Sequence, residues 1–170
     1  METQTVLTEV KRCLGNIERF DQKVNAFITV LSDTALEEAQ QADDDYAGGS
    51  GAGLLAGVPI SVKDCIDVAG IRCTNGSLFF KDYVPERDAL IVQRLRKAGA
   101  VIVGKTNLHE FAYGSTTQNP HYGPTRNPWD LTRIPSGSSG GAGASLAAAM
   151  CGGAGGSAPG GSVRTPAAMN

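Results

Sequence analysis

The segment from residue 58 to residue 103 constrains the fold most, because it reads as a strand, a helix and a second strand. Residues 58–62 form a short segment rich in β-branched side chains, which predicts a strand. Residues 88–98 carry apolar side chains at helical spacing, which predicts a helix. Residues 100–103 form a continuous apolar run, typical of a strand buried on both faces. This order predicts a right-handed parallel crossover and therefore an α/β fold.

The helix over 88–98 has recognisable signals at both ends. Asp88 is a candidate N-cap, and Gly99 falls where a left-handed residue commonly ends a helix. The spacing predicts an inner face of Leu90, Ile91, Leu95 and Ala98, with Arg94, Arg96 and Lys97 outside.

The first 47 residues read as a helical appendage on an α/β core that begins at residue 54. Apolar side chains at steps of three and four predict a helix over 6–20. Ser32 can cap a second helix, which we expect to end in the acidic run 43–45. A glycine-rich stretch follows and predicts a flexible connection.

The charge balance excludes one class of function. The chain has 170 residues, 41% of them hydrophobic, which is enough for a packed core. It carries 15 Lys and Arg against 17 Asp and Glu, a net charge of -2. A surface that coats nucleic acid needs clustered positive charge, so we expect no direct nucleic-acid binding.

Cysteine and histidine usage argues against a metal centre. The four cysteines show no CxxC spacing and there are two histidines, so we expect no metal and no cofactor. The N-terminus has no apolar signal segment, and no apolar run approaches the ~18 residues that a membrane span needs. We therefore expect a cytoplasmic protein with reduced thiols and no membrane partner.

Glycine is concentrated near the end of the chain. Of 22 glycines, ten fall between residues 137 and 161. Such stretches are often linkers. The run 142–150 is instead rich in alanine, which predicts a helix without bulky side chains that can approach another backbone closely.

Two motif matches do not fit their usual chemistry. Residues 99–106 match GxxxxGK[ST], but the variable positions Ala-Val-Ile-Val favour a strand over a phosphate-binding loop. Residues 137–141 match the GxSxG nucleophile elbow, which requires a histidine later in the chain, and none follows His121. The order histidine, Asp130, serine stays formally available through His109 or His121, without support from spacing.

With these two motifs set aside, the remaining functional interpretation is a serine hydrolase in which a lysine acts as the base. Such a base must be neutral, and therefore desolvated. Lys63 is the natural candidate because it closes the predicted strand 58–62, and the ends of strands build sites. Pattern alone leaves other lysines and arginines open.

Taken together, these motifs resemble the amidase signature family. The resemblance covers essentially all 170 residues, and the N-terminal helices look like those of the A subunit of glutamyl-tRNA(Gln) amidotransferase. The matching stretches are residues 57–64, 104–107, 119–124, 133–141 and 160–164.

The resemblance implies a mixed sheet with flanking helices and a Ser–cis-Ser–Lys triad. By position, Lys63 would be the base, Ser138 the relay on a cis peptide bond, and Ser162 the nucleophile that carries the acyl group. The backbone N–H groups of Gly160, Gly161 and Ser162 would form the oxyanion hole.

The chain departs from the family pattern in three places. Glycine is usual where Ser136 stands, and Asp followed by a residue with an N–H is usual where Ala158 and Pro159 stand. Proline has no N–H, so one oxyanion donor is missing. Family members are also far longer, so we expect residues 1–170 to be the N-terminal portion of one amidase signature domain. The buried strand and Lys63 would then need neighbours beyond Asn170, and we expect the chain alone to be poorly soluble or loosely packed and inactive.

The resemblance implies an amidase that cleaves a small carboxamide substrate through an acyl-enzyme. An alternative is the glutamine-hydrolysing A subunit of glutamyl-tRNA(Gln) amidotransferase, with B and C subunits as partners and tRNA as an indirect one. A second alternative is a fragment that carries the motifs without activity.

Overall fold

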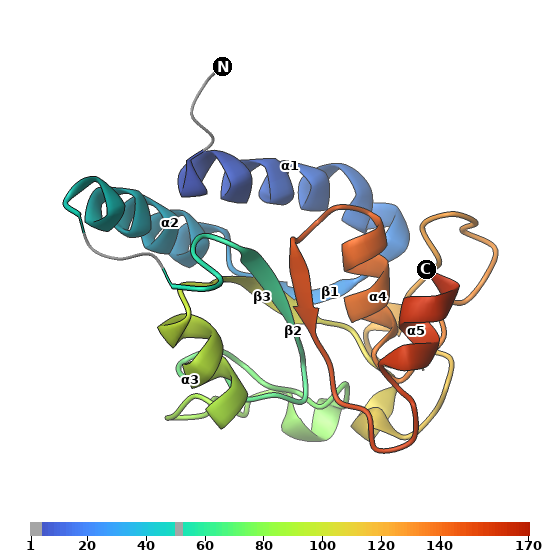
Figure 1. The fold of residues 1–170 in the computed structure, drawn as a ribbon. Coiled ribbons are helices and arrows are strands. Elements are labelled where there is room, and N and C mark those ends of the chain that lie inside the picture. Colours follow the sequence, from blue (N-terminus) through green and yellow to red (C-terminus); the bar gives the residue numbers. More distant parts are fainter. Residues whose placement is uncertain (1–4, 50–52) are drawn as a thin grey trace.

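The computed structural model describes residues 5–49 and 53–170 and centres on a four-stranded sheet with helices on both faces (Figure 1). The strand order is β1-β3-β2-β6, in which β1 is antiparallel to β3, and β2 is parallel to both β3 and β6. The sheet is therefore mixed, as expected. Its strands are β1 (Phe27–Val30), β2 (Pro59–Lys63), β3 (Val101–Thr106) and β6 (Gly153–Gly155). A two-stranded sheet joins β4 (Gln118–Asn119) and β5 (Gly123–Pro124).

Helices cover the sheet and connect its strands. They are α1 (Val6–Val24), α2 (Ser32–Ala47), α3 (Leu90–Lys97), α4 (Gly140–Ala147) and α5 (Arg164–Met169), with short 3-10 turns η1 (Leu78–Phe80) and η2 (Glu110–Ala112). The side chain of Thr5 caps α1 by accepting a hydrogen bond from the Thr8 N–H at 3.1 Å. Within the described residues, no helix is both long and apolar enough to cross a membrane.

The predicted parallel crossover from β2 to β3 is confirmed. It also shows that the residues matching the phosphate-loop motif form a strand. β3 runs parallel to β2, with α3 between the two strands in the chain, and all six of its residues are buried. Gly104, Lys105 and Thr106 lie inside this strand. An extended backbone cannot turn successive N–H groups toward one phosphate, so the motif is not a nucleotide-binding loop.

Two predicted helix caps are wrong. Helix α2 starts at Ser32 itself, with Leu31 at the N-cap and no side-chain cap, and it continues through the acidic run to Ala47. Helix α3 has Ala89 at its N-cap, while the carboxylate of Asp88 accepts a hydrogen bond from the Ala69 N–H at 2.7 Å. An N-cap side chain works only if it faces the helix's own free N–H groups, and Asp88 faces a neighbouring loop instead.

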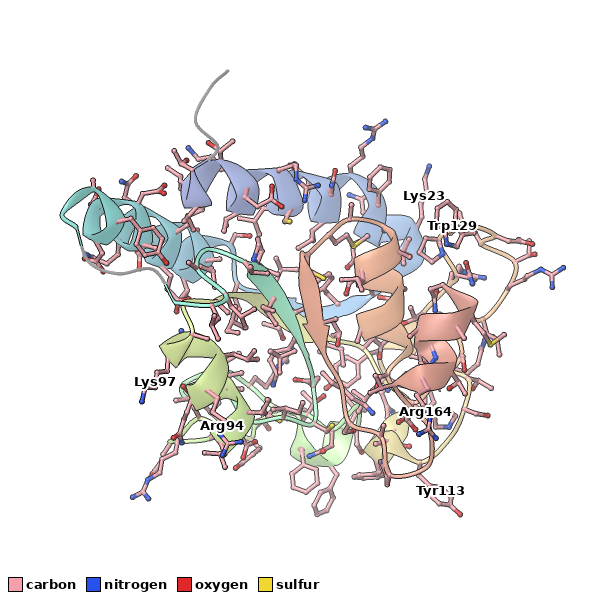
Figure 2. All side chains as sticks on the ribbon, viewed as in Figure 1. Lys23, Arg94, Lys97, Tyr113, Trp129 and Arg164 are labelled. Carbon is pink, nitrogen blue, oxygen red and sulfur yellow. The ribbon has the colours of Figure 1, made fainter. Side chains whose placement is uncertain are left out.

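The C-terminal end of α3 is as predicted, but its inner face is not. Gly99 adopts the left-handed conformation, with φ of +91°. Val92 is the fully buried residue of α3, whereas Leu90 and Ile91 are 60% and 48% exposed. Figure 2 shows Arg94 and Lys97 projecting from α3 away from the sheet. The helix is rotated about its axis relative to the predicted stripe.

The described part of segment 1–47 belongs to the main fold rather than lying beside it. Strand β1 pairs with β3 inside the sheet. Helices α1 and α2 bury apolar side chains against one face of β3, in a cluster that also includes Met150 and Cys151. The opposite face is covered by α3, through Val92, and by the loops around it. Part of the expected glycine-rich connection, residues 50–52, lies outside the described residues.

Helix α4 lies unusually close to other backbone, as its small side chains predict. A Cβ added at Gly141 would come within 2.5 Å of the carbonyl oxygens of Ala26 and Asn107. Only glycine leaves room for that approach. The approach holds the start of α4, and the serine-rich segment before it, against the ends of β2 and β3.

Candidate active site

The site forms around Lys63, the last residue of β2. Its side chain is fully buried. The amine Nζ lies 2.7 Å from the Ser138 Oγ and 2.9 Å from the Ser157 Oγ, and 3.4 Å from the Ser157 carbonyl oxygen. The amine is therefore held by hydroxyl and carbonyl oxygens, without a carboxylate among these partners.

This environment favours the neutral amine. Burial lowers the pKa of Lys63 from its usual value of 10.5, and the nearby Cys65 acts in the opposite direction. The expectation that Lys63 would depend on sequence beyond Asn170 for its burial is wrong. Residues from β2, the segment before α4 and the segment after β6 already enclose it. A buried amine that accepts protons is the property a lysine base requires.

Ser138 is held in a defined position beside this amine. The peptide bond between Gly137 and Ser138 is cis, and Ser138 is fully buried. The Ser138 carbonyl oxygen accepts a hydrogen bond from the His109 N–H at 3.1 Å, and the Gly137 carbonyl accepts one from the Thr165 hydroxyl at 3.1 Å. The backbone on both sides of the cis bond is therefore tied to other parts of the chain.

Ser162 lies beside this segment, but its hydroxyl makes no hydrogen bond with Ser138. Its carbonyl oxygen accepts a hydrogen bond from the Ser139 N–H at 3.2 Å, which places the two serine-bearing segments side by side. The Ser162 hydroxyl is half-buried and makes no hydrogen bond with any residue of 5–49 or 53–170. The structure thus joins Lys63 to Ser138, and leaves the Ser162 hydroxyl unengaged nearby.

Ser157 is a site residue that sequence reasoning missed. It follows β6 and places both its hydroxyl and its carbonyl oxygen near the Lys63 amine. Its hydroxyl is also 3.5 Å from the Cys65 sulfur, and its carbonyl accepts a hydrogen bond from the Ser139 hydroxyl at 3.3 Å. Its place in the second Gly/Ser cluster was the available signal. Only the parallel pairing of β6 with β2 brings it to the lysine.

The backbone at Gly160, Gly161 and Ser162 carries the N–H groups expected to form the oxyanion hole. Among the described residues, nothing accepts a hydrogen bond from the backbone N–H of Gly160, Gly161 or Ser162. Gly161 is buried with φ of +104°, a conformation that favours glycine. Pro159 precedes them, is exposed, and offers no N–H.

The histidines are engaged elsewhere, so a histidine triad is not assembled. The His109 Nδ1 lies 3.2 Å from the Thr116 hydroxyl, and the His121 Nε2 lies 2.9 Å from a carboxylate oxygen of Glu110. Asp130 binds its own neighbours in a surface turn. In the portion of the chain that the structure describes, neither imidazole ring makes a hydrogen bond with Asp130 or with a site serine.

The four cysteines are unpaired, and burial keeps two of them in the thiol form. It raises the pKa of Cys13 to about 11 and that of Cys73 to about 12. Among the described residues, no group of three or more histidine, cysteine or acidic side chains could hold a metal ion.

Comparison with known proteins agrees with the motifs. A protein-family model described as Amidase matches residues 9–170. The A subunit of glutamyl-tRNA(Gln) amidotransferase from Syntrophus aciditrophicus (strain SB) is 48% identical over 160 residues, which is 94% of this chain and 33% of that protein. The chain spans about a third of the length of the curated relatives it matches.

Solved structures share the fold. A bacterial aryl acylamidase belonging to the amidase signature enzymes family superimposes with a TM-score of 0.91 at 32% identity, covering 97% of this chain and 34% of that one. The glutamyl-tRNA(Gln) amidotransferase A subunit from Thermotoga maritima has a TM-score of 0.78 with 37% identity, covering 97% of this chain and 36% of that one.

Proposed function

Because the chain belongs to the amidase signature family, we propose that its site provides the serine–lysine chemistry of an amide hydrolase. The observation that carries the proposal is the 2.7 Å contact between the buried Lys63 amine and the Ser138 hydroxyl. A neutral amine beside a hydroxyl can take its proton, which is the first requirement of such a mechanism.

In the proposed reaction, Lys63 accepts a proton from Ser138 as Ser138 accepts one from Ser162. The Ser162 oxygen then attacks the amide carbonyl carbon, and the tetrahedral oxyanion is stabilised by the free N–H groups before Ser162. The C–N bond breaks, the leaving amine takes the proton back through Ser138, and an acyl-enzyme remains. Water hydrolyses the ester by the same proton path in reverse. The relay requires a hydrogen bond between the Ser162 and Ser138 hydroxyls, and the backbone bond from the Ser139 N–H to the Ser162 carbonyl supports it by holding the two segments side by side.

The test uses a chimera that joins this chain to the remaining two thirds of the Syntrophus aciditrophicus relative. Lys63→Ala and Ser162→Ala should each abolish amide hydrolysis. Lys97→Ala, on the exposed side of α3, is the matched control and should not. A fluorophosphonate should label Ser162, as read by peptide mass spectrometry. An adduct on Ser139 or full activity of Lys63→Ala would refute the assignment.

The 170-residue chain alone provides a second comparison. We propose that it lacks turnover even though Lys63 is buried in it. The outer side of β6 has no strand partner among the described residues, and Leu146, Val163 and Met169 expose apolar side chains. Amide hydrolysis by the monomeric chain would show that this third of the relatives' length is a self-sufficient enzyme.

A second candidate function is the glutamine-hydrolysing A subunit of glutamyl-tRNA(Gln) amidotransferase. It is favoured by the relatives, because the matches in Syntrophus aciditrophicus and Carboxydothermus hydrogenoformans both carry that name. Partners would then be the B and C subunits and, through them, tRNA. Assaying the chimera with glutamine and with simple aliphatic and aryl amides separates the two functions. Loss of all activity in the chimera would favour a non-catalytic chain.

A further inference from the structure

Two fully buried lysines lie near the ends of neighbouring strands of the sheet, on opposite faces: Lys63 is the last residue of β2, and Lys105 is the last but one of β3. Lys63 closes β2 and lies on the face covered by α4, where Ser138 is. Lys105 pairs with Val62 in β3, because the register of the two strands shifts after Ile60. Val62 packs in the cluster on the α3 side, so Lys105 faces that side. The sheet thus separates the two amines.

The two lysines have different surroundings. The Lys105 Nζ lies 2.9 Å from one carboxylate oxygen of Asp64, and both side chains are fully buried. The other Asp64 oxygen accepts hydrogen bonds from the N–H and the hydroxyl of Thr74. The charge of Lys105 is therefore matched by a carboxylate that is itself anchored. The Lys63 amine has hydroxyl and carbonyl partners.

Asp64, the partner of Lys105, follows Lys63 directly in the chain. A buried carboxylate requires a nearby positive charge. Without Lys105, the Asp64 carboxylate would be an unbalanced negative charge one residue from Lys63, although the two side chains lie on opposite faces of the sheet. A nearby unbalanced negative charge favours the protonated amine of Lys63, and a protonated lysine cannot act as a base.

We propose that Lys105 is a positioning residue that neutralises Asp64, so that the adjacent Lys63 amine stays free of a counter-charge and available as a base. This inference rests on the proposed function of Lys63. The pair also ties the loop after β2 to the end of β3, since the Asp64 N–H donates to the Thr106 carbonyl at 3.0 Å. The other titratable groups near these side chains are Cys65, beside Lys63, and Cys73, beside the pair, with Asp67 next to Cys73.

The experiment reads the pKa of the Lys63 amine directly, by NMR of protein labelled with ¹³C and ¹⁵N in lysine. The Lys63 signal is assigned by its absence from Lys63→Ala. Lys105→Met should raise the Lys63 pKa by about one unit or more, as expected for an unpaired opposite charge nearby. Asp64→Asn leaves the positive charge of Lys105 without a partner and should lower the Lys63 pKa. The double variant Asp64→Asn/Lys105→Met removes both charges and should restore the wild-type value.

Two outcomes would overturn the proposal: an unchanged Lys63 pKa in Lys105→Met, or the same rise in the double variant as in the single one. Ile102→Ala, a buried change in the same strand without a change of charge, controls for general loosening and should leave the Lys63 pKa unmoved. The Lys63 pKa is measured in both the 170-residue chain and the chimera, so that aggregation of the shorter protein does not determine the result. If Lys105→Met does not fold, the opposite shift in Asp64→Asn decides.

The spectroscopic readout is independent of turnover, so the two proposals fail separately. Failure of the proposed function would appear as full activity of Lys63→Ala in the chimera. Failure of the proposed role of Lys105 would appear as a Lys63 pKa that is the same in Lys105→Met as in the wild type. In the chimera, the alkaline shift in Lys105→Met should also move the rising limb of the pH–rate profile upward, and the double variant should move it back.

Discussion

Replacing Lys63 by methionine should change how the stability of the protein depends on pH. Lys63 is fully buried and burial lowers its pKa below 10.5. Between the lowered pKa and 10.5, the unfolded chain holds a proton on this amine that the folded chain has released. Unfolding therefore takes up a proton, so the free energy of unfolding rises with pH across that window.

The size of the effect follows from linkage. One proton taken up on unfolding gives a slope of about 1.4 kcal/mol per pH unit. Methionine has a similar length and nothing to titrate, so the Lys63→Met variant lacks this slope. The variant also loses the contacts to Ser138 and Ser157, each about 1 kcal/mol, but this loss does not vary with pH while the amine is neutral. The slope is therefore the diagnostic quantity.

The assay is urea unfolding of dilute wild-type and variant chains from about pH 6 to about pH 10. The difference in free energy of unfolding between the two chains should change by about 1.4 kcal/mol per pH unit inside the window. Other titrating groups are common to both chains and cancel. Lys97→Met, on the exposed side of α3, should run parallel to the wild type. Parallel curves for Lys63→Met would refute the idea of a neutral buried amine.

Three further substitutions test the site and its support, and a fourth serves as a control for the first. Gly141→Ala should destabilise the fold by about 1–3 kcal/mol in thermal unfolding, because the new methyl would meet backbone oxygens at 2.5 Å. Its control, Gly15→Ala, with nothing within 4 Å and inside α1, should instead stabilise by about 1 kcal/mol. In the chimera, Pro159→Thr should raise kcat by about 10²–10³ if it restores an oxyanion donor, and an unchanged kcat would contradict that role. Ser157→Ala should lower kcat about tenfold through the lost contact with Lys63, and no loss would contradict it.

The sequence predicted the elements whose own side chains determine their structure. Strands β2 and β3 are recognisable because continuous β-branched runs suit a strand buried on both faces. Strand β6 is Gly-Ala-Gly, which has no strand preference of its own, and it forms because the edge of β2 offers it a parallel partner. Strand β1 is four residues long and half-buried, and it depends in the same way on β3. Tertiary pairing, rather than local preference, decides both.

In the candidate site, too, some residues could be predicted from the sequence, whereas their contacts depend on tertiary structure. Lys63 and Ser138 could be nominated from residue type and resemblance. Their mutual contact depends on the approach of α4 to the sheet, which the alanine-rich run predicts only in outline. Ser157 was not nominated, because its place in the second Gly/Ser cluster is a weak signal and its contact with Lys63 comes from the placement of β6. The buried pairing of Lys105 with Asp64 depends on a register shift, which residue patterns do not reveal.

The glycines from Gly153 to Gly156 are not a linker. They allow the serine-bearing segments to pack close to each other and to the end of β2. A Cβ at Gly156 would come within 2.8 Å of Val163 and 3.0 Å of the Ser139 hydroxyl, and one at Gly153 would come within 2.8 Å of Ile60 in β2. Side chains there would push β6 away from β2 and separate the serine-bearing segments. Because parallel pairing runs Gly153 and Gly155 alongside β2 toward its end, the residues after β6 emerge where Lys63 closes β2. Ser157 reaches the lysine amine for that reason. The absence of bulky side chains in β6 is thus what allows Lys63, Ser138 and Ser157, which are distant in the sequence, to meet at one place.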